Sequence, residues 1–293
     1  MTESRMLDRI LVPLDGSPLS ESVLPDVRRL LRRSDAEVIL VRSEYPLLTN
    51  PYPGLVAESA LGAVTSYLQG VADRLGEQGV RARTVADSGP AAEAILRAAQ
   101  SERATLIALS THGRTGAARV VMGSVAEQVL RGSPVPVLAV RMIPDLAGEF
   151  GPTDERRPFR NVLVPLDRSE RALRALGPAA DICRLFGARL LVLHVLESEN
   201  DRETGEAYLR AVEARAASQG LAVTSLVDRG DAVEEILDVA RFHDIDLVVM
   251  ATHGRRGLSR LTTGSVTEGV LRRSAVPVLV TRTADSASRE SVA

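Results

Sequence analysis

The sequence predicts an α/β fold with two tandem, doubly wound domains, each built on a five-stranded parallel sheet covered by helices on both faces. Three observations support this prediction. The chain repeats itself, short β-branched runs alternate with helical periodicity in each copy, and several of those runs are apolar throughout, as doubly buried parallel strands are. We expect the first domain at residues 1–148 and the second at 158–284.

The internal repeat defines the two copies. Residues 9–15 read R-I-L-V-P-L-D, and residues 160–167 read R-N-V-L-V-P-L-D. From Gly89 to Arg141 the matches keep one spacing of 141 residues, whereas the first strands are 152 residues apart. The first copy therefore carries 11 extra residues, which fall in the proline-rich stretch Tyr45–Ser59.

Each copy alternates five short β-branched runs with segments of helical periodicity. In the first copy we expect strands at 10–14, 37–42, 81–86, 105–110 and 136–141. Between them we expect helices at 20–33, 60–77, 91–100 and 124–131. In the second copy we expect strands at 161–166, 189–195, 222–227, 246–251 and 277–282. Strands separated by helices imply crossover connections and a parallel sheet. The segment 144–158, rich in Pro, Gly and acidic residues, marks the domain boundary.

Composition excludes several functional classes. All 36 basic side chains are Arg, so the chain lacks the Lys of phosphate-binding loops, kinases and Schiff-base enzymes. The net charge of -2, with Arg scattered among Asp and Glu, argues against nucleic acid as a partner. The longest apolar runs are about seven residues, too short for a membrane span, and the N-terminus has no signal core. We therefore expect a soluble, cytoplasmic protein without a membrane partner.

The ligands of a doubly wound sheet lie beyond the carboxyl ends of its strands, near the switch in strand order. Asp15 and Asp167 end the first strand of each copy. Each carboxylate could accept hydrogen bonds from a ribose, or it could instead stabilise a turn or a helix start. The residues alone leave both alternatives open.

Two Gly-Ser pairs, Gly123-Ser124 and Gly264-Ser265, open the last helix of each copy. A helix N-terminus presents free N–H groups and a partial positive charge, and glycine admits a close backbone approach. These pairs are therefore suited to phosphate. A Glu follows each serine three positions later, which is also the capping-box pattern, so capping by the serine is the alternative.

The histidines and the cysteine do not predict catalysis or a metal site. His112 and His253 follow the fourth strands, but no Cys or Ser nucleophile with an orienting group stands beside them. His194 lies in an apolar strand and His243 near a helix end, without the partners of a metal site. The single cysteine, Cys183, lies in a helical pattern that predicts a buried packing role.

With these motifs the chain resembles the universal stress protein family over nearly its whole length. The nucleotide-binding members of that family carry the pattern G-x2-G-x9-G-[ST]. Gly113, nine residues and Gly123-Ser124 match it in the first copy, and Gly254, nine residues and Gly264-Ser265 match it in the second. The Val-Pro-Leu-Asp opening and the Pro-Val-Leu close also occur in both copies.

The resemblance implies an adenine-nucleotide α-hydrolase-like, Rossmann-like fold that binds ATP, with Mg as a candidate companion ion. It implies phosphates at the Gly-rich loop and helix start, ribose near the end of strand one and adenine near the end of strand two. The nucleotide-binding residues implied in the first copy are Pro13, Asp15, Gly16, Ser43, Gly113, Arg114, Gly123, Ser124 and Val125. Those implied in the second copy are Pro165, Asp167, Val195, Gly254, Arg255, Gly264, Ser265 and Val266.

The resemblance also implies that the last strands, 136–141 and 277–282, pair as a pseudo-dimer inside the chain, and that two chains could form a homodimer. This sequence departs from the family pattern at its first Gly, which is Ser110 in copy one and Ala251 in copy two. The two sites therefore need not bind ATP equally. Copy one is favoured, because Gly16 stands where copy two has Arg168 and because the long stretch after its second strand could close over an adenine.

The leading hypothesis is an ATP-binding regulatory or stress-response protein with slow ATP hydrolysis at most. Arg114 and Arg255 could neutralise phosphate charge, which supports binding more than chemistry. The alternatives are a nucleotide-free scaffold that binds a protein partner and an enzyme of the related hydrolase fold.

Overall fold

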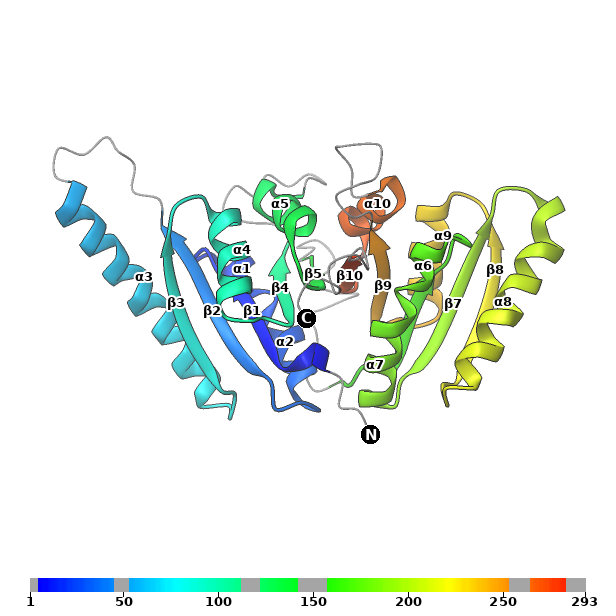
Figure 1. Ribbon diagram of the computed structural model, residues 1–293, viewed down its shortest axis with the longest axis horizontal. Coiled ribbons are helices and arrows are strands. Elements are labelled where there is room, and N and C mark those ends of the chain that lie inside the picture. The colour runs from blue at the N-terminus through cyan, green and yellow to red at the C-terminus, as the bar shows by residue number, and fades with distance from the viewer. Residues whose placement is uncertain (1–4, 45–52, 112–121, 142–156, 253–263, 283–293) are drawn as a thin grey trace, which may run out of the picture. The chain divides into compact units, whose positions relative to one another are not determined.

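The computed structural model describes residues 5–44, 53–111, 122–141, 157–252 and 264–282 (Figure 1). The chain divides into two compact units, Met1–Arg157 and Pro158–Ala293. We call them unit 1 and unit 2 and consider each by itself.

Unit 1 contains a parallel sheet in which the strand order is β3-β2-β1-β4-β5 (Figure 1). Its strands are β1 (Arg9–Pro13), β2 (Glu37–Glu44), β3 (Ala82–Ser88), β4 (Leu106–Ser110) and β5 (Val137–Val140). The order reverses direction at β1, which pairs with β2 on one side and with β4 on the other. The carboxyl ends of β1 and β4 therefore meet at the switch point, where doubly wound sheets bind ligands.

Unit 2 repeats this topology with the order β8-β7-β6-β9-β10. Its strands are β6 (Asn161–Pro165), β7 (Arg189–Leu196), β8 (Val223–Arg229), β9 (Leu247–Thr252) and β10 (Val278–Arg282). Its helices are α6 (Glu170–Leu173), α7 (Leu176–Phe186), α8 (Arg202–Ala217), α9 (Ala232–Phe242) and α10 (Ser265–Arg273), with the 3-10 turn η3 (Glu199–Asp201) before α8. The predicted doubly wound parallel fold is thus confirmed in both copies.

The helices of unit 1 differ from the prediction in two places. They are α1 (Pro18–Glu21), α2 (Leu24–Leu31), α3 (Pro53–Gly76), α4 (Ala91–Ser101) and α5 (Ser124–Gly132), after the 3-10 turn η1 (Arg5–Leu7). The single helix expected at 20–33 is wrong, because Pro25 sits in the first turn of α2. Its ring would collide with the carbonyl four residues earlier, at Glu21, so α1 ends there.

The stretch after β2 is also not the 15-residue loop that the prolines suggested. α3 begins at Pro53, seven residues before the expected start, and proline is well suited to a first helical turn. Residues 45–52 lie outside the described part of the chain. The extra residues of copy one therefore lengthen a helix in part, and α3 has 24 residues where α8 has 16.

The core of each unit lies on both faces of its central strands. Ile10, Leu11 and Val12 of β1 are fully buried, as are Val162, Leu163 and Val164 of β6. At roughly 2 kcal/mol for each large aliphatic side chain removed from water, these strands are held firmly in place. They form the rigid frame from which the functional loops extend.

Cys183 on α7 is buried with 3% of its surface exposed and has no disulfide. Burial raises the pKa of its thiol to about 12, so the predicted packing role is confirmed. Across the described ranges, no helix combines the length and the apolar character that a membrane span needs.

Candidate functional site

A cavity of about 360 Å³ opens at the switch point of unit 1, beyond the carboxyl ends of β1, β2 and β4 and in front of α5. A matching cavity of about 300 Å³ lies at the same place in unit 2, in front of α10. Both volumes fall at the lower end of the range for small-molecule sites.

Most of the sequence-predicted residues line these cavities. In unit 1 they are Pro13, Asp15, Ser43, Gly123, Ser124 and Val125. In unit 2 they are Pro165, Asp167, Val195, Gly264, Ser265 and Val266. Ser110 and Ala251, where the chain departs from the family pattern, also line their cavities. Gly16 does not contribute to the lining of its cavity. Four predicted site residues lie outside the described part of the chain, namely Gly113, Arg114, Gly254 and Arg255. The same holds for His112 and His253.

The start of the last helix faces each cavity without a capping side chain. The N-cap residues are Gly123 and Gly264, and neither α5 nor α10 has a side-chain cap hydrogen bond. Ser124 and Ser265 are instead the first helical residues and are exposed. The capping-box alternative is therefore wrong, and the first N–H groups of the helix stay available to an anion.

The two N-cap glycines are not equivalent. Gly123 has φ -62°, which any residue adopts, and a Cβ there would lie 3.5 Å from the Thr111 carbonyl oxygen, at ordinary contact distance. Gly264 has φ 91°, in the region that favours glycine. The backbone therefore requires glycine in unit 2 but not in unit 1.

Asp15 and Asp167 each stabilise the turn that follows the first strand. The Asp15 Oδ1 accepts a hydrogen bond from the Ser17 N–H at 2.9 Å, and Ser17 in turn caps α1. The Asp167 Oδ1 accepts from the Ser169 N–H at 3.0 Å, and Ser169 caps α6. The turn role is thus established in both units, and a ribose contact through the other carboxylate oxygen stays a prediction.

The residue after each of these aspartates has a left-handed backbone. The φ angle is 86° at Gly16 and 64° at Arg168. A Cβ at Gly16 would come within 2.6 Å of the Arg42 Nη1 atom, so glycine there also makes room for a guanidinium. Unit 2 has the same turn at Arg168, although the backbone of a non-glycine residue rarely adopts this conformation.

Arg42 is a cavity residue that the sequence reasoning missed. It lines the cavity of unit 1, lies 5.2 Å from the centre of the Tyr67 ring and pairs with Glu44 at 3.5 Å. The signal in the sequence is a charged side chain between Val41 and Ser43 at the end of an otherwise apolar strand. It adds a cation to a cavity that the family pattern describes only by its glycines.

Unit 2 has His194 at the position of Arg42, since both follow the strand residue paired with the first-strand proline. The His194 Nδ1 hydrogen-bonds the Leu166 carbonyl at 2.7 Å, and the side chain is 5% exposed. It does not line the cavity and instead packs edge-to-face against the Tyr208 ring, with 6.0 Å between the ring centres. Each cavity has one arginine in its described lining, which is Arg42 at the end of β2 in unit 1 and Arg171 of α6 in unit 2.

Ser43 and Val195 occupy the position expected near adenine. The Ser43 hydroxyl donates to the Gly89 carbonyl at 2.6 Å, which joins the end of β2 to the loop after β3. Val195 offers only apolar surface. Among the residues whose placement is described, no three His, Cys, Asp or Glu side chains are grouped to hold a metal ion.

The comparisons with known proteins agree on one family. The model of the universal stress protein family matches residues 6–141 and 158–282. A universal stress protein of Mycolicibacterium smegmatis is 27% identical over 304 aligned positions, which cover 96% of this chain and 99% of that protein. Universal stress protein MJ0531 of Methanocaldococcus jannaschii is 31% identical over 141 residues, covering 45% of this chain and 81% of that protein. The crystal structure of a universal stress protein from Archaeoglobus fulgidus superposes with a TM-score of 0.77 at 25% identity, covering 94% of this chain and 98% of that chain.

Proposed function

This chain belongs to the universal stress protein family, and we propose that it is an ATP-binding regulatory member whose nucleotide sites are the two switch-point cavities. One observation carries the proposal. In both units an uncapped helix start, with an exposed serine as its first residue, faces a cavity at the carboxyl ends of the central strands. That arrangement suits a phosphate chain.

The phosphates would lie against the N-termini of α5 and α10. The free N–H groups there carry a partial positive charge, and the Ser124 and Ser265 hydroxyls can each donate one further hydrogen bond. Gly113, Arg114, Gly254 and Arg255 are proposed to complete the phosphate contacts. Asp15 and Asp167 would accept hydrogen bonds from the ribose hydroxyls, as acidic residues do at other switch points.

The adenine would lie near Ser43 in unit 1 and near Val195 in unit 2. Leu109 and Ile95 add apolar surface to the unit 1 cavity, and Ile236 and Met250 do so in unit 2. Apolar walls with a few polar groups are typical of small-molecule sites. Mg, if it accompanies ATP, would be held through the phosphates and water.

We propose binding with slow hydrolysis at most. The charged side chains in the described linings are Asp15, Arg42 and Glu44 in unit 1 and Asp167 and Arg171 in unit 2. Each lining therefore has a single guanidinium, and Oδ1 of each aspartate is already engaged in a turn. An alkoxide or a water nucleophile would need a base, a bound metal or a dense set of cations to accelerate attack on phosphorus.

Calorimetry of the purified chain with ATP and with Mg-ATP tests the proposal, and native mass spectrometry shows whether nucleotide co-purifies. We expect binding to at least one site. Ser124→Ala and Ser265→Ala should each weaken the affected site by roughly tenfold, because a hydrogen bond to a charged group is lost. Ser17→Gly would serve as a control for the neighbouring turn. No heat at millimolar ATP with folded protein would reject ATP binding and leave the nucleotide-free scaffold.

The domain boundaries at 1–148 and 158–284, and the pairing of the last strands as a pseudo-dimer, form part of the same proposal. If the last strand of copy one is an association surface, residues 1–148 alone should self-associate. Sedimentation velocity measures this directly. A well-behaved monomer would argue against pairing through that strand.

A further inference from the structure

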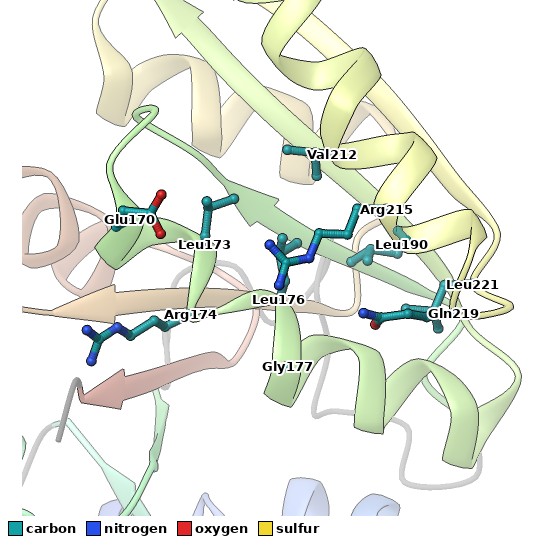
Figure 2. A pocket seen from close by; sticks show the side chains of 11 residues that line it. Glu170, Leu173, Arg174, Leu176, Gly177, Leu190, Val212, Arg215, Gln219 and Leu221 are labelled. Carbon is teal, nitrogen blue, oxygen red and sulfur yellow. The ribbon is translucent and has the colours of Figure 1, made fainter. Parts of the chain in front are cut away.

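Unit 2 has a second cavity that shares no lining residue with its switch-point cavity. It has a volume of about 440 Å³ and lies between α6, the start of α7 and α8 (Figure 2). Leu173, Leu176, Leu190 and Leu221 supply most of its apolar wall. Figure 2 shows Arg215 reaching from α8 toward Leu176 on α7.

At the corresponding place in unit 1, a carboxylate of the chain itself is bound by two side chains. Glu21, the last residue of α1, accepts a hydrogen bond from the Tyr67 hydroxyl at 2.8 Å on one oxygen. Its other oxygen pairs with the Arg74 guanidinium at 2.7 Å. Two residues of α3 thus hold one carboxylate at the end of α1.

Unit 2 keeps both of these carboxylate-binding residues but has no carboxylate. The repeat spacing of 141 aligns Tyr67 with Tyr208 and Arg74 with Arg215, and the spacing of 152 aligns Glu21 with Leu173. The Tyr208 hydroxyl is buried and has no hydrogen-bond partner. Of the ion pairs and hydrogen bonds found among the described side chains, none involves the Arg215 guanidinium. The exposed Arg215 guanidinium therefore lines the cavity without the carboxylate partner that Arg74 has in unit 1.

We propose that this cavity binds a small amphiphilic carboxylic acid, with its carboxylate on Arg215 and its apolar chain on Leu173, Leu176 and Leu221. The ligand carboxylate would pair with Arg215 as Glu21 pairs with Arg74 in unit 1. Gln219, in the turn that follows α8, presents an amide that can donate to the same group. The cavity volume lies within the range of small-molecule sites.

The charged side chains on the cavity lining are Arg215, Arg174 and Glu170. Figure 2 shows Arg174 extending away from Arg215, and Glu170 at the α6 end of the cavity, beyond Leu173. The Glu170 carboxylate would repel a second anionic group at that end, so a ligand with a single negative charge is favoured. An uncharged chain would form no ion pair with Arg215, so affinity should depend on the carboxylate.

Octanoate is the probe that fits this description, and octanamide is its uncharged counterpart. We expect the full-length chain to bind one octanoate by calorimetry and by ligand-observed NMR, and to bind octanamide at least about tenfold more weakly. Arg215→Gln should weaken octanoate binding by a similar factor. Arg74→Gln, the matched change in unit 1, should leave it unchanged.

Leu173→Glu supplies the decisive variant, because it restores the internal carboxylate that unit 1 contains. We expect it to abolish octanoate binding while circular dichroism shows an intact fold. The proposal is overturned if the unmodified chain does not bind octanoate at millimolar concentration, if octanamide binds as well, or if Arg215→Gln binds octanoate as tightly as the unmodified chain. ATP binding does not enter this experiment, so its result is independent of the nucleotide proposal.

Discussion

The two units share a topology but stabilise it with different side chains, and the differences concentrate around the first helical segment and the end of the second strand. In unit 1 this region is charged: Glu21, Arg42 and Arg74 form ion pairs there. In unit 2 the equivalents of Glu21 and Arg42 are Leu173 and His194, and His194 is buried against a backbone carbonyl. A duplicated fold therefore tolerates exchange of its polar contacts as long as the central strands stay apolar.

The largest expected effect is the loss of a buried ion pair found in unit 1. Asp26 is fully buried and pairs with Arg29 at 3.2 Å, whereas unit 2 has Pro178 at the Asp26 position. Asp26→Ala should destabilise unit 1 by about 3–5 kcal/mol, because it leaves a buried guanidinium without its carboxylate. Hydrogen exchange measured by mass spectrometry should show faster exchange in unit 1 only. An equal increase of the exchange rate in unit 2 would mean that the two units unfold as one.

The next largest expected effect is a loss of stability that depends on which of the two N-cap glycines is replaced. Gly264→Val places a β-branched residue at φ 91° and should destabilise unit 2 by about 1–3 kcal/mol. Gly123→Val, at φ -62°, should leave the stability of unit 1 nearly unchanged. Urea denaturation followed by circular dichroism measures both. Equal destabilisation would show that the φ difference is not maintained in solution.

The guanidinium that β2 contributes to the unit 1 cavity should raise the affinity of that cavity for ATP. Arg42→Gln removes a guanidinium that lines this cavity, and we expect roughly tenfold weaker ATP binding at unit 1. His194→Gln is the matched change in unit 2 and should not alter ATP affinity, because His194 does not line the cavity there. Titration calorimetry of both variants tests whether unit 1 is the better nucleotide site. If Arg42→Gln binds ATP unchanged, Arg42 does not contribute to the nucleotide site of unit 1.

The smallest effect concerns the turn after the first strand. Arg168→Gly relieves a left-handed backbone at a non-glycine residue and should stabilise unit 2 by about 0.5 kcal/mol. The reverse change in unit 1, Gly16→Ala, should destabilise it by more, since a Cβ there approaches Arg42 at 2.6 Å. Thermal melts of the two variants should shift in opposite directions. A lower melting temperature for Arg168→Gly would show that the Arg168 side chain stabilises unit 2 by more than its backbone strain destabilises it.

The secondary structure was predictable because it depends on local patterns. All ten strands lie within two residues of their expected positions, since continuous apolar runs such as Leu190–Leu193 can be buried on both sides only in a doubly covered sheet. The errors occurred at prolines, where two effects compete. Pro25 divides a helix that hydrophobic spacing made continuous, and Pro53 starts a helix where proline content suggested a loop.

The positions of the candidate site residues were predictable for a related reason. Parallel strands bring their carboxyl ends to one edge, so residues at the ends of β1 and β2 and at the start of α5 must converge once the strand order is known. The contribution of Arg42 was not predictable in this way. The direction of the Arg42 side chain depends on contacts with Tyr67 and Glu44 and on the space above Gly16. These three residues lie in α3, at the end of β2 and in the turn after β1.

The sequence by itself determined the duplication, the order of strands and helices and the Gly-Ser start of each last helix, because these depend on residues close together in the chain or on direct repetition. Only the tertiary structure decided that Gly123 and Gly264, rather than the serines, cap those helices. It also decided that Glu21 is held by Tyr67 and Arg74 while Tyr208 and Arg215 have lost the matching carboxylate. Backbone angles and charge partners are set by contacts between residues far apart in sequence, so patterns read along the chain cannot specify them.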